Sequence, residues 1–256
     1  MSKTLLSLPL GALAVIMLGL SVAVTIWAAR RTLPTAQAAE PSSPVLPALH
    51  AAVSTVYTVL LAFVVVIVWQ QFSDAGSRVE TEAIRLSNIL RDTAVFADAD
   101  RTEMHDAVLS YVRLASTREW DSMARGNVSD AATTRAYEHI WDIAYRIKPV
   151  GVSQEAFYRE VLTRLNELGA ARRSRLLSAR ASVSWVLWSL LLGGAALVLY
   201  LSLMLPSGPD HRARTVALVA TGCVITLTLF VIFVFDHPYN GSVRVDPGPL
   251  IDLLSR

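Results

Sequence analysis

A group of closely spaced arginines offers the clearest chemistry in this chain of 256 residues. Arg172, Arg173, Arg175 and Arg180 follow one another with no acidic residue among them. Guanidinium groups bind phosphate and other anions, and a basic group just before an apolar segment is typical of contact with anionic lipid headgroups. We therefore favour the lipid bilayer as their partner and do not expect a nucleic acid.

Residue types that can catalyse reactions are present, but none stands in a catalytic arrangement. The five histidines lack the spacing of metal ligands, and the sequence has no phosphate-binding glycine loop, nucleophile elbow or HExxH motif. Asp98, Asp100 and Glu103 are explained better by helix capping and solvation than by metal binding. The one cysteine, Cys223, excludes an internal disulfide and a cysteine-based metal cluster. We therefore expect no enzyme, no cofactor and no metal site.

Four uncharged apolar stretches dominate the sequence. They cover residues 4–29, 41–73, 181–209 and 215–235 and contain no Asp, Glu, Lys or Arg. A helix needs about 20 apolar residues to cross a hydrocarbon core that is about 30 Å thick. All four stretches are long enough, which predicts an all-α membrane protein with four transmembrane helices.

These stretches divide the chain into segments. We expect transmembrane helices over 1–30, 49–72, 183–204 and 215–235, joined by a proline-rich linker over 31–48, a helical domain over 73–182 and a tail over 236–256. A cleaved signal peptide is the alternative for the first stretch. Its uncharged run of 26 residues, however, exceeds the apolar core of a signal peptide, about 7–15 residues, so we favour a retained span.

The basic residues near the membrane predict the orientation. Four spans place both termini and the central domain on one side, where eight basic residues face four on the other side. The eight are Lys3, Arg78, Arg85, Arg172, Arg173, Arg175, Arg180 and Arg244, and the four are Arg30, Arg31, Arg212 and Arg214. Because basic residues favour the cytoplasmic side, we expect the central domain and both termini in the cytoplasm. A high-GC bacterial source would explain the preference for arginine over lysine.

The central domain has the periodicity of helices. Apolar residues recur at three- and four-residue intervals over 79–94, 104–120, 136–147 and 157–168. No stretch shows the strict alternation of a strand, so the domain is expected to be all-helical. The domain is expected to consist in part of extensions of the second and third spans. Ser73 or Ser77 can cap the segment after the second span, and Ser129 is expected to open a later helix.

The third span contains a small-residue pattern. Ser189 and Gly193 are four residues apart, a spacing that lets neighbouring transmembrane helices approach closely. We therefore expect a close helix–helix contact on this face.

Three short segments together point to a family. They are WQQFSDA at 69–75 after the second span, RRSRL at 172–176 before the third, and DHPYNGSVRV at 236–245 after the fourth. In this order, the chain resembles bacterial bestrophin-like domain proteins of the DUF4239 family, over residues 45–256. Bestrophins are pentameric anion channels with cytosolic termini and a cytosolic helical domain. The resemblance implies a bestrophin-like fold and a homo-oligomer, by analogy a pentamer, that passes small inorganic anions.

By the same analogy, the second span is the candidate pore helix. Ser54 and Thr58 share one face with Leu61 and Val65 at helical spacing. Hydroxyl groups can replace part of an ion's hydration shell, and an apolar ring below them can gate by dewetting. The alternative, which the sequence alone favours, is that both hydroxyls bond to carbonyl groups in a packed helix interface.

The remaining motif residues have positional interpretations. Arg172, Arg173 and Arg175 could form an anion vestibule in an oligomer, although contact with lipid headgroups is the plainer interpretation. Asp74 is expected to pair with one of these arginines. Trp69 ends the second span in an interfacial belt. In the tail, Pro238 and Gly241 are expected to turn the chain, and Tyr239 is expected to pack against the domain.

Two functions of different kinds follow. The leading one is a bestrophin-like homo-oligomeric ion channel, for anions by analogy, in the bacterial inner membrane. The alternative is a non-conducting membrane scaffold or sensor whose helical domain docks a cytoplasmic partner. The oligomeric state separates them, because so few polar residues in each subunit require a pore built from several copies.

Overall fold

A computed structural model describes the chain except residues 1–9, 37–43, 127–128, 206–210, 242 and 256, and the side chains of 10, 11, 13, 28–36 and 211. Lys3, the start of the first expected span and part of the 31–48 linker lie outside the described residues. The described residues contain helices and no strand, as the sequence predicts. They form two compact units, one of residues 1–70, 182–236 and 241–243, the other of 71–181, 237–240 and 244–256.

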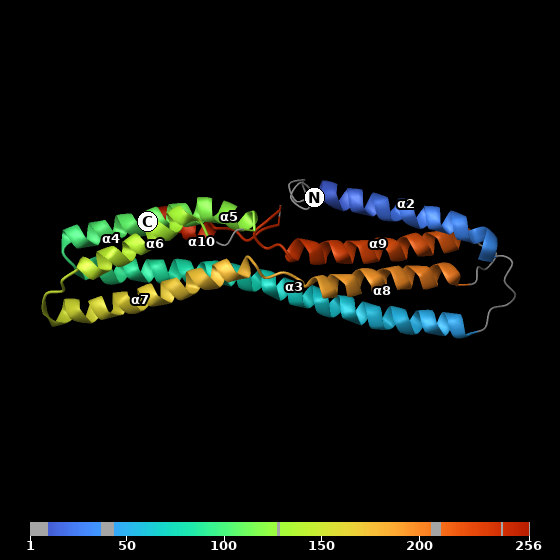
Figure 1. Ribbon diagram of the computed structural model, residues 1–256, viewed down its shortest axis with the longest axis horizontal. Helices are drawn as coiled ribbons and strands as arrows, with labels where there is room; N and C mark the ends of the chain where they lie inside the picture. The colour runs from blue at the N-terminus through green and yellow to red at the C-terminus, as the bar shows by residue number, and fades with distance from the viewer. Residues whose placement is uncertain (1–9, 37–43, 127–128, 206–210, 242, 256) are drawn as a thin grey trace. The chain divides into compact units, whose positions relative to one another are not determined.

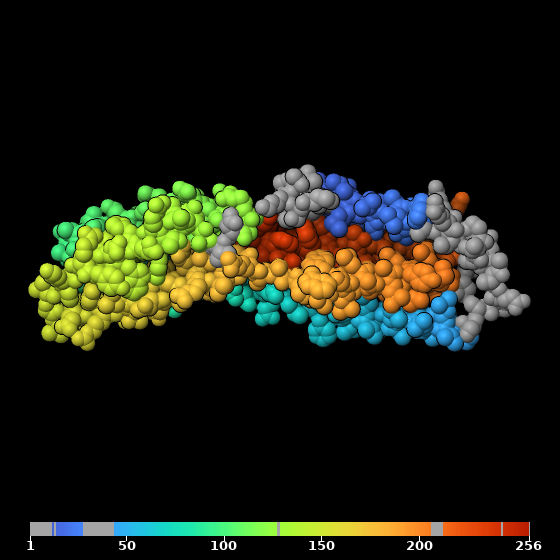
Figure 2. Space-filling view, viewed as in Figure 1, coloured from blue at the N-terminus to red at the C-terminus, as the bar shows by residue number. Residues whose placement is uncertain are grey.

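The first unit is a bundle of apolar helices (Figure 1). It contains α2 (Leu10–Ala36), the first part of α3 (Val45–Asp92), α8 (Trp185–Met204) and α9 (His211–Phe235). Helix α9 contacts both α2 and α8, and Figure 2 shows it between them. Many large apolar side chains point outward, among them Val56, which is 71% exposed. An apolar helix surface of this kind suits lipid or a neighbouring subunit.

Three described helices are long and apolar enough to cross a membrane. They are the segment Val45–Val95, which contains α3, then α8 and the segment Arg212–Phe235 of α9. Helix α2 carries a shorter apolar segment, Ala14–Trp27, among its described residues. In the structure, three of the four expected spans are therefore helices with the length and composition of a transmembrane helix. The first expected span remains a prediction.

Helix α3 extends the second span into the helical domain, as the sequence predicts. It runs without a break over 48 residues, so no helix is capped at Ser73 or Ser77. The third span has no such extension, because α7 ends at Ser178 and α8 begins at Trp185. Helix α3 contains no proline after Pro47, and continuing the backbone hydrogen bonds costs less than ending and restarting them. Pro47 itself lies in the first turn, where the missing N–H has no helical partner to lose.

The second unit is a helical domain with its own core. It contains the second part of α3, the 3₁₀ turn η1 (Thr93–Val95), α4 (Asp98–Leu114), the π-helical turn η2 (Ala115–Glu119), α5 (Trp120–Ala124), α6 (Ala131–Arg146), α7 (Gly151–Ser178), α10 (Gly248–Ile251) and the 3₁₀ turn η3 (Asp252–Ser255). The tail helix α10 and η3 contact α4. The cap of α6 is Asp130, which accepts from Ala132 N at 3.0 Å, rather than Ser129.

The close helix contact in the first unit occurs at Gly194, one residue beyond the expected position. A Cβ at Gly194 would lie 2.5 Å from Cδ2 of Tyr57, while one at Gly193 would meet nothing within 4 Å. Tyr57 donates to the Leu191 carbonyl at 3.0 Å, which joins α3 to α8. Ser189 instead donates to the carbonyl of Trp185 in its own helix, so the expectation for Ser189 and Gly193 was wrong.

This difference between neighbouring glycines gives a direct test. We expect Gly194→Ala to displace the Tyr57 ring and lower the free energy of unfolding by about 1–3 kcal/mol, the usual cost of overpacking. The control, Gly193→Ala, should be neutral or stabilising by up to about 1 kcal/mol, because alanine is the better helix former. Thermal unfolding of both purified variants in detergent measures the difference, and equal melting temperatures would contradict the contact.

Candidate functional site

The first unit contains a pocket of about 810 Å³ between α3, α8 and α9. The four residues predicted to line a pore, Ser54, Thr58, Leu61 and Val65, are all among its lining residues. Opposite them, α9 contributes Thr221, Val224, Ile225 and Thr228, and α8 contributes Val198. The structure thus brings the predicted set together on one wall, in a mainly apolar pocket with hydroxyl groups on two sides.

The hydroxyl groups of this pocket differ in whether they donate a hydrogen bond to a backbone carbonyl group. Thr221 and Thr228 donate to carbonyl groups of their own helix, at 2.9 Å each. Ser54 lies 3.4 Å from Nε2 of His50, and Thr58 is exposed. Among the described residues, neither Ser54 nor Thr58 donates to a carbonyl group. The packed-interface interpretation that the sequence favoured is therefore wrong for these two side chains.

His50 precedes the four predicted pore residues on α3 and links α3 to α8. Its Nε2 atom lies 2.8 Å from the Ser202 hydroxyl, which in turn donates to the Val198 carbonyl at 2.7 Å. A serine hydroxyl has a single proton, so Ser202 can only accept from His50. The contact therefore requires a proton on Nε2 of His50.

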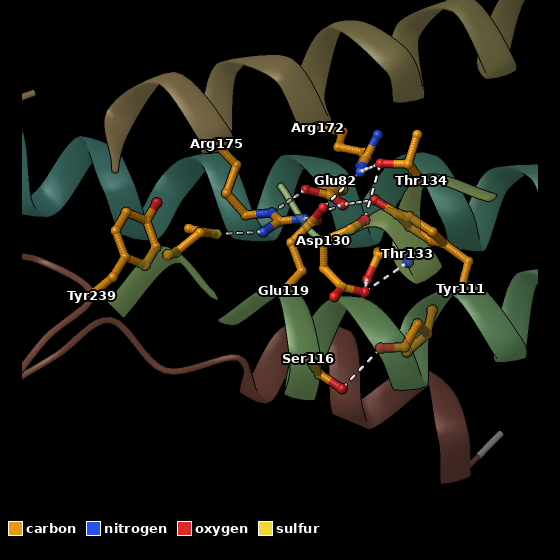
Figure 3. A network of polar contacts seen from close by, with 12 residues as sticks. Glu82, Tyr111, Ser116, Glu119, Asp130, Thr133, Thr134, Arg172, Arg175 and Tyr239 are labelled. Carbon is orange, nitrogen blue, oxygen red and sulfur yellow. Dashed lines mark hydrogen bonds and ion pairs between the residues drawn. The ribbon is translucent and has the colours of Figure 1, made fainter. Parts of the chain in front are cut away.

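The second unit encloses a network of charged side chains (Figure 3). Arg175 of α7 is fully buried, with 0% of its surface exposed. Its Nε lies 2.6 Å from Oε2 of Glu82 on α3, and its Nη2 lies 2.7 Å from Oε2 of Glu119 in η2. The third nitrogen, Nη1, lies 3.0 Å from the sulfur of Met123, and the Trp120 ring stacks 5.6 Å from the guanidinium.

A second arginine and a tyrosine complete this network. Arg172 lies one turn before Arg175 and pairs with Oε1 of Glu119 at 2.6 Å, and it also donates to Thr134 at 3.0 Å. The hydroxyl of Tyr111 donates to Oε1 of Glu82. The carboxylates of Glu82 and Glu119 therefore balance the two guanidinium groups. Glu119 binds both arginines, whereas Glu82 binds Arg175 and Tyr111.

The surroundings keep these groups in their ordinary charge states. Burial opposes the charge on Arg175, but the carboxylates of Glu82 and Glu119 outweigh it and hold the pKa of Arg175 well above its usual range. Burial, and then the negative charge of Glu82, raise the pKa of the Tyr111 hydroxyl well above its ordinary value. Tyr111 therefore stays a neutral donor beside the ionised network.

These contacts correct the interpretation of the basic motif. Arg175 is buried and Arg172 is only 9% exposed, so neither guanidinium reaches a lipid headgroup or an ion vestibule in this structure. Arg173 is exposed and remains available for either role. Asp74 is exposed as well, and among the described residues no ion pair joins it to these arginines, which Glu82 and Glu119 hold instead.

The sequence carried a signal for the two missed carboxylates. Glu82 lies three residues after Val79 and four before Leu86, within the apolar stripe of its helix. Glu119 likewise lies four residues after the buried Ala115. A charge at a core position needs a buried partner, since an unpaired one is too costly. Such positions therefore mark candidate pairs.

Residues 237–240 of the tail motif belong to the same unit, whereas Gly241 belongs to the first unit. Tyr239 is buried, its hydroxyl lies 2.8 Å from that of Ser178, and its ring packs edge-on against Trp120 with centroids 5.4 Å apart. Asn240 N donates to the carbonyl of His237 in a turn that includes Pro238, and Gly241 has a φ of +89°, which favours glycine. In the first unit, Trp69 packs edge-on against Phe235 at 5.2 Å.

The fold and these features define a helical membrane protein with an ion-paired helical domain. The chain belongs to the family defined by the Bestrophin-like domain, whose model matches residues 13–250. No curated protein sequence matches it.

Solved structures share the fold. A point mutant of a bacterial bestrophin homologue from Klebsiella pneumoniae aligns over 94% of this chain and 99% of its own, with 14% identity and a TM-score of 0.72. A variant of a membrane protein aligns over 95% and 99% of the two chains, with 13% identity and a TM-score of 0.70. These likenesses establish a bestrophin fold for this chain.

The buried network predicts a large difference between neighbouring arginines. We expect Arg175→Met to lower the free energy of unfolding by about 3–5 kcal/mol, because it leaves the buried Glu82 without its cation and Glu119 with Arg172 alone. Arg173→Met, at an exposed position of the same helix, should change it by less than about 0.5 kcal/mol. Thermal unfolding followed by circular dichroism compares the two variants.

A further variant separates the unpaired charge from the lost contacts. Adding Glu82→Gln to Arg175→Met removes the carboxylate that has lost its cation, while Glu119 keeps Arg172 as its partner, so part of the loss should be recovered. A double variant less stable than Arg175→Met alone would show that unpaired charge is not the cause.

Proposed function

We propose that this protein is a homo-oligomeric ion channel, selective for small inorganic anions, in a bacterial inner membrane. Four helices would cross the bilayer, with both termini and the helical domain in the cytoplasm. The family supports the channel class, since bestrophins conduct anions. The observation that carries the proposal is the pocket that joins Ser54, Thr58, Leu61 and Val65 on one wall of α3.

The chemistry of that wall suits partial dehydration of an anion. The Ser54 and Thr58 hydroxyl protons are not given to carbonyl groups, so they can be donated to an ion instead. Leu61 and Val65 follow one and two turns later and offer an apolar constriction. The described lining residues include no Asp, Glu, Lys or Arg, which keeps an anion from being held too tightly to leave.

A single copy does not suffice for a pore. The outward face of α3 is apolar, with Phe63 65% exposed, and it offers a surface on which neighbouring copies can pack. A ring of copies would surround a passage with several α3 helices, as the likeness to pentameric bestrophins implies. A pentamer is therefore the assembly that we propose.

One observation favours the alternative of a scaffold or sensor. Tyr145, Val150 and Val152 are 70%, 79% and 87% exposed where α6 leads into α7. Exposed apolar side chains grouped in sequence are typical of a docking surface for another protein. A partner of the helical domain would bind there without any ion flow.

The assembly can be measured directly. We expect native mass spectrometry of the protein in nanodiscs to give one closed oligomer, and proteoliposomes containing it to take up chloride. A monomer or dimer without chloride uptake would contradict the channel and support the scaffold, whose partners should then be sought with the helical domain.

The gate assignment has its own test. We expect Leu61→Ala combined with Val65→Ala to raise chloride flux several-fold, because a wider and less apolar constriction wets more easily. Val56→Ala combined with Val59→Ala is the control, since both side chains are exposed on α3 outside the pocket. Equal flux through both double variants, at equal oligomer mass, would show that Leu61 and Val65 do not form the gate.

A further inference from the structure

His50 is the one histidine among the residues that line the pocket. It lies in the early turns of α3, one helical turn before Ser54 and two before Thr58. The bonds described above require a proton on Nε2, because the Ser202 proton is given to Val198. The other ring nitrogen, Nδ1, is therefore the atom that gains or loses a proton.

Protonation of this ring would add charge without breaking a contact. Both the neutral ring with a proton on Nε2 and the doubly protonated ring donate to Ser202. The link between α3 and α8 thus persists in both states. Only the charge at the end of the pocket changes, by one unit.

We propose that protonated His50 forms a binding site for a small inorganic anion at this end of the pocket, together with the Ser54 hydroxyl. The site rests on the proposed function in that it would load the conduction pathway with anions at acidic pH. Histidine side chains change charge between about pH 5 and pH 8, which makes the loading adjustable by the surrounding medium.

The charged groups around His50 fit an anion and not a cation. Helix α9 brings two arginines to the same end of the unit, and Arg214 donates to the carbonyl of Leu203, the neighbour of Ser202. On helix α8 the nearest titratable residue to Ser202 is Tyr200, which is 57% exposed. On α3 the nearest one is Tyr57, whose hydroxyl donates to Leu191, and the α2 arginines lie outside the described side chains.

A bound anion would favour the charged form of the imidazole, because the two opposite charges attract each other. Proton and anion should therefore bind together, each increasing the affinity for the other. The structure has no carboxylate among the described pocket residues that could stabilise the imidazolium in place of an anion.

The experiment compares chloride binding with chloride flux. Line broadening of the chloride NMR signal reports binding to the purified oligomer, and uptake by proteoliposomes reports flux, each at about pH 5.5 and about pH 7.5, on either side of the usual histidine range. Both should rise several-fold on acidification. His50→Gln keeps a donor for Ser202 but takes up no proton, so both signals should stay at their neutral-pH level.

Two further variants guard against a folding defect. His50→Arg carries a permanent charge and should give high binding at both pH values. His105→Gln, at an exposed histidine of α4, should behave as the unchanged protein. An equal acid response in His50→Gln would overturn the site.

The two proposals fail separately. Flux that is present but does not depend on pH or on His50 would keep the channel and overturn the anion site. Binding that depends on pH and His50, without any flux, would support the site and overturn the channel. Absence of acid-dependent binding in the unchanged protein would overturn the site whatever the flux.

Discussion

The burial of the Arg175 guanidinium between two carboxylates is the constraint on which the helical domain depends. Removing a full charge from water costs several kcal/mol, and the loss is recovered only when each partner is in place. Here the partners come from α3 and η2, which are far apart in the sequence. Small shifts of one helix along another would separate these atoms, whereas purely apolar packing tolerates many alternatives. The network therefore specifies one arrangement of α3, η2 and α7.

The sequence predicted the helices well because their signals are local. Hydrophobic periodicity and uncharged length identified three of the membrane helices and the all-helical domain. The same method treated Arg172 and Arg175 as surface groups, since it gives charged residues to solvent or lipid by default. Leu165, Leu168, Arg172 and Arg175 follow the spacing of a single buried stripe. That spacing reveals burial, but it does not reveal which of many acidic residues is the partner.

Contacts in the membrane unit were harder to predict for a related reason. Ser189 and Gly193 have the small-residue spacing, whereas Gly194 has Leu190 and Val198 four residues away, and only the rotation of α8 decides which glycine meets Tyr57. The wall of Ser54, Thr58, Leu61 and Val65 was predictable, because these residues lie on one face of one helix. The opposite wall on α9 was not, because it depends on how two helices pack. His50 was missed as well, since its partner Ser202 is 152 positions away.

The π-helical turn at Ala115–Glu119 sets the direction of the Glu119 side chain. Such a turn holds one residue more than a turn of the α-helix around it, and π-turns are frequent at functional sites. An α-helix advances by about 100° for each residue, so losing that residue would rotate Glu119 away from both arginines. The ion pairs therefore depend on a local departure from α-helical geometry as well as on which residues are acidic.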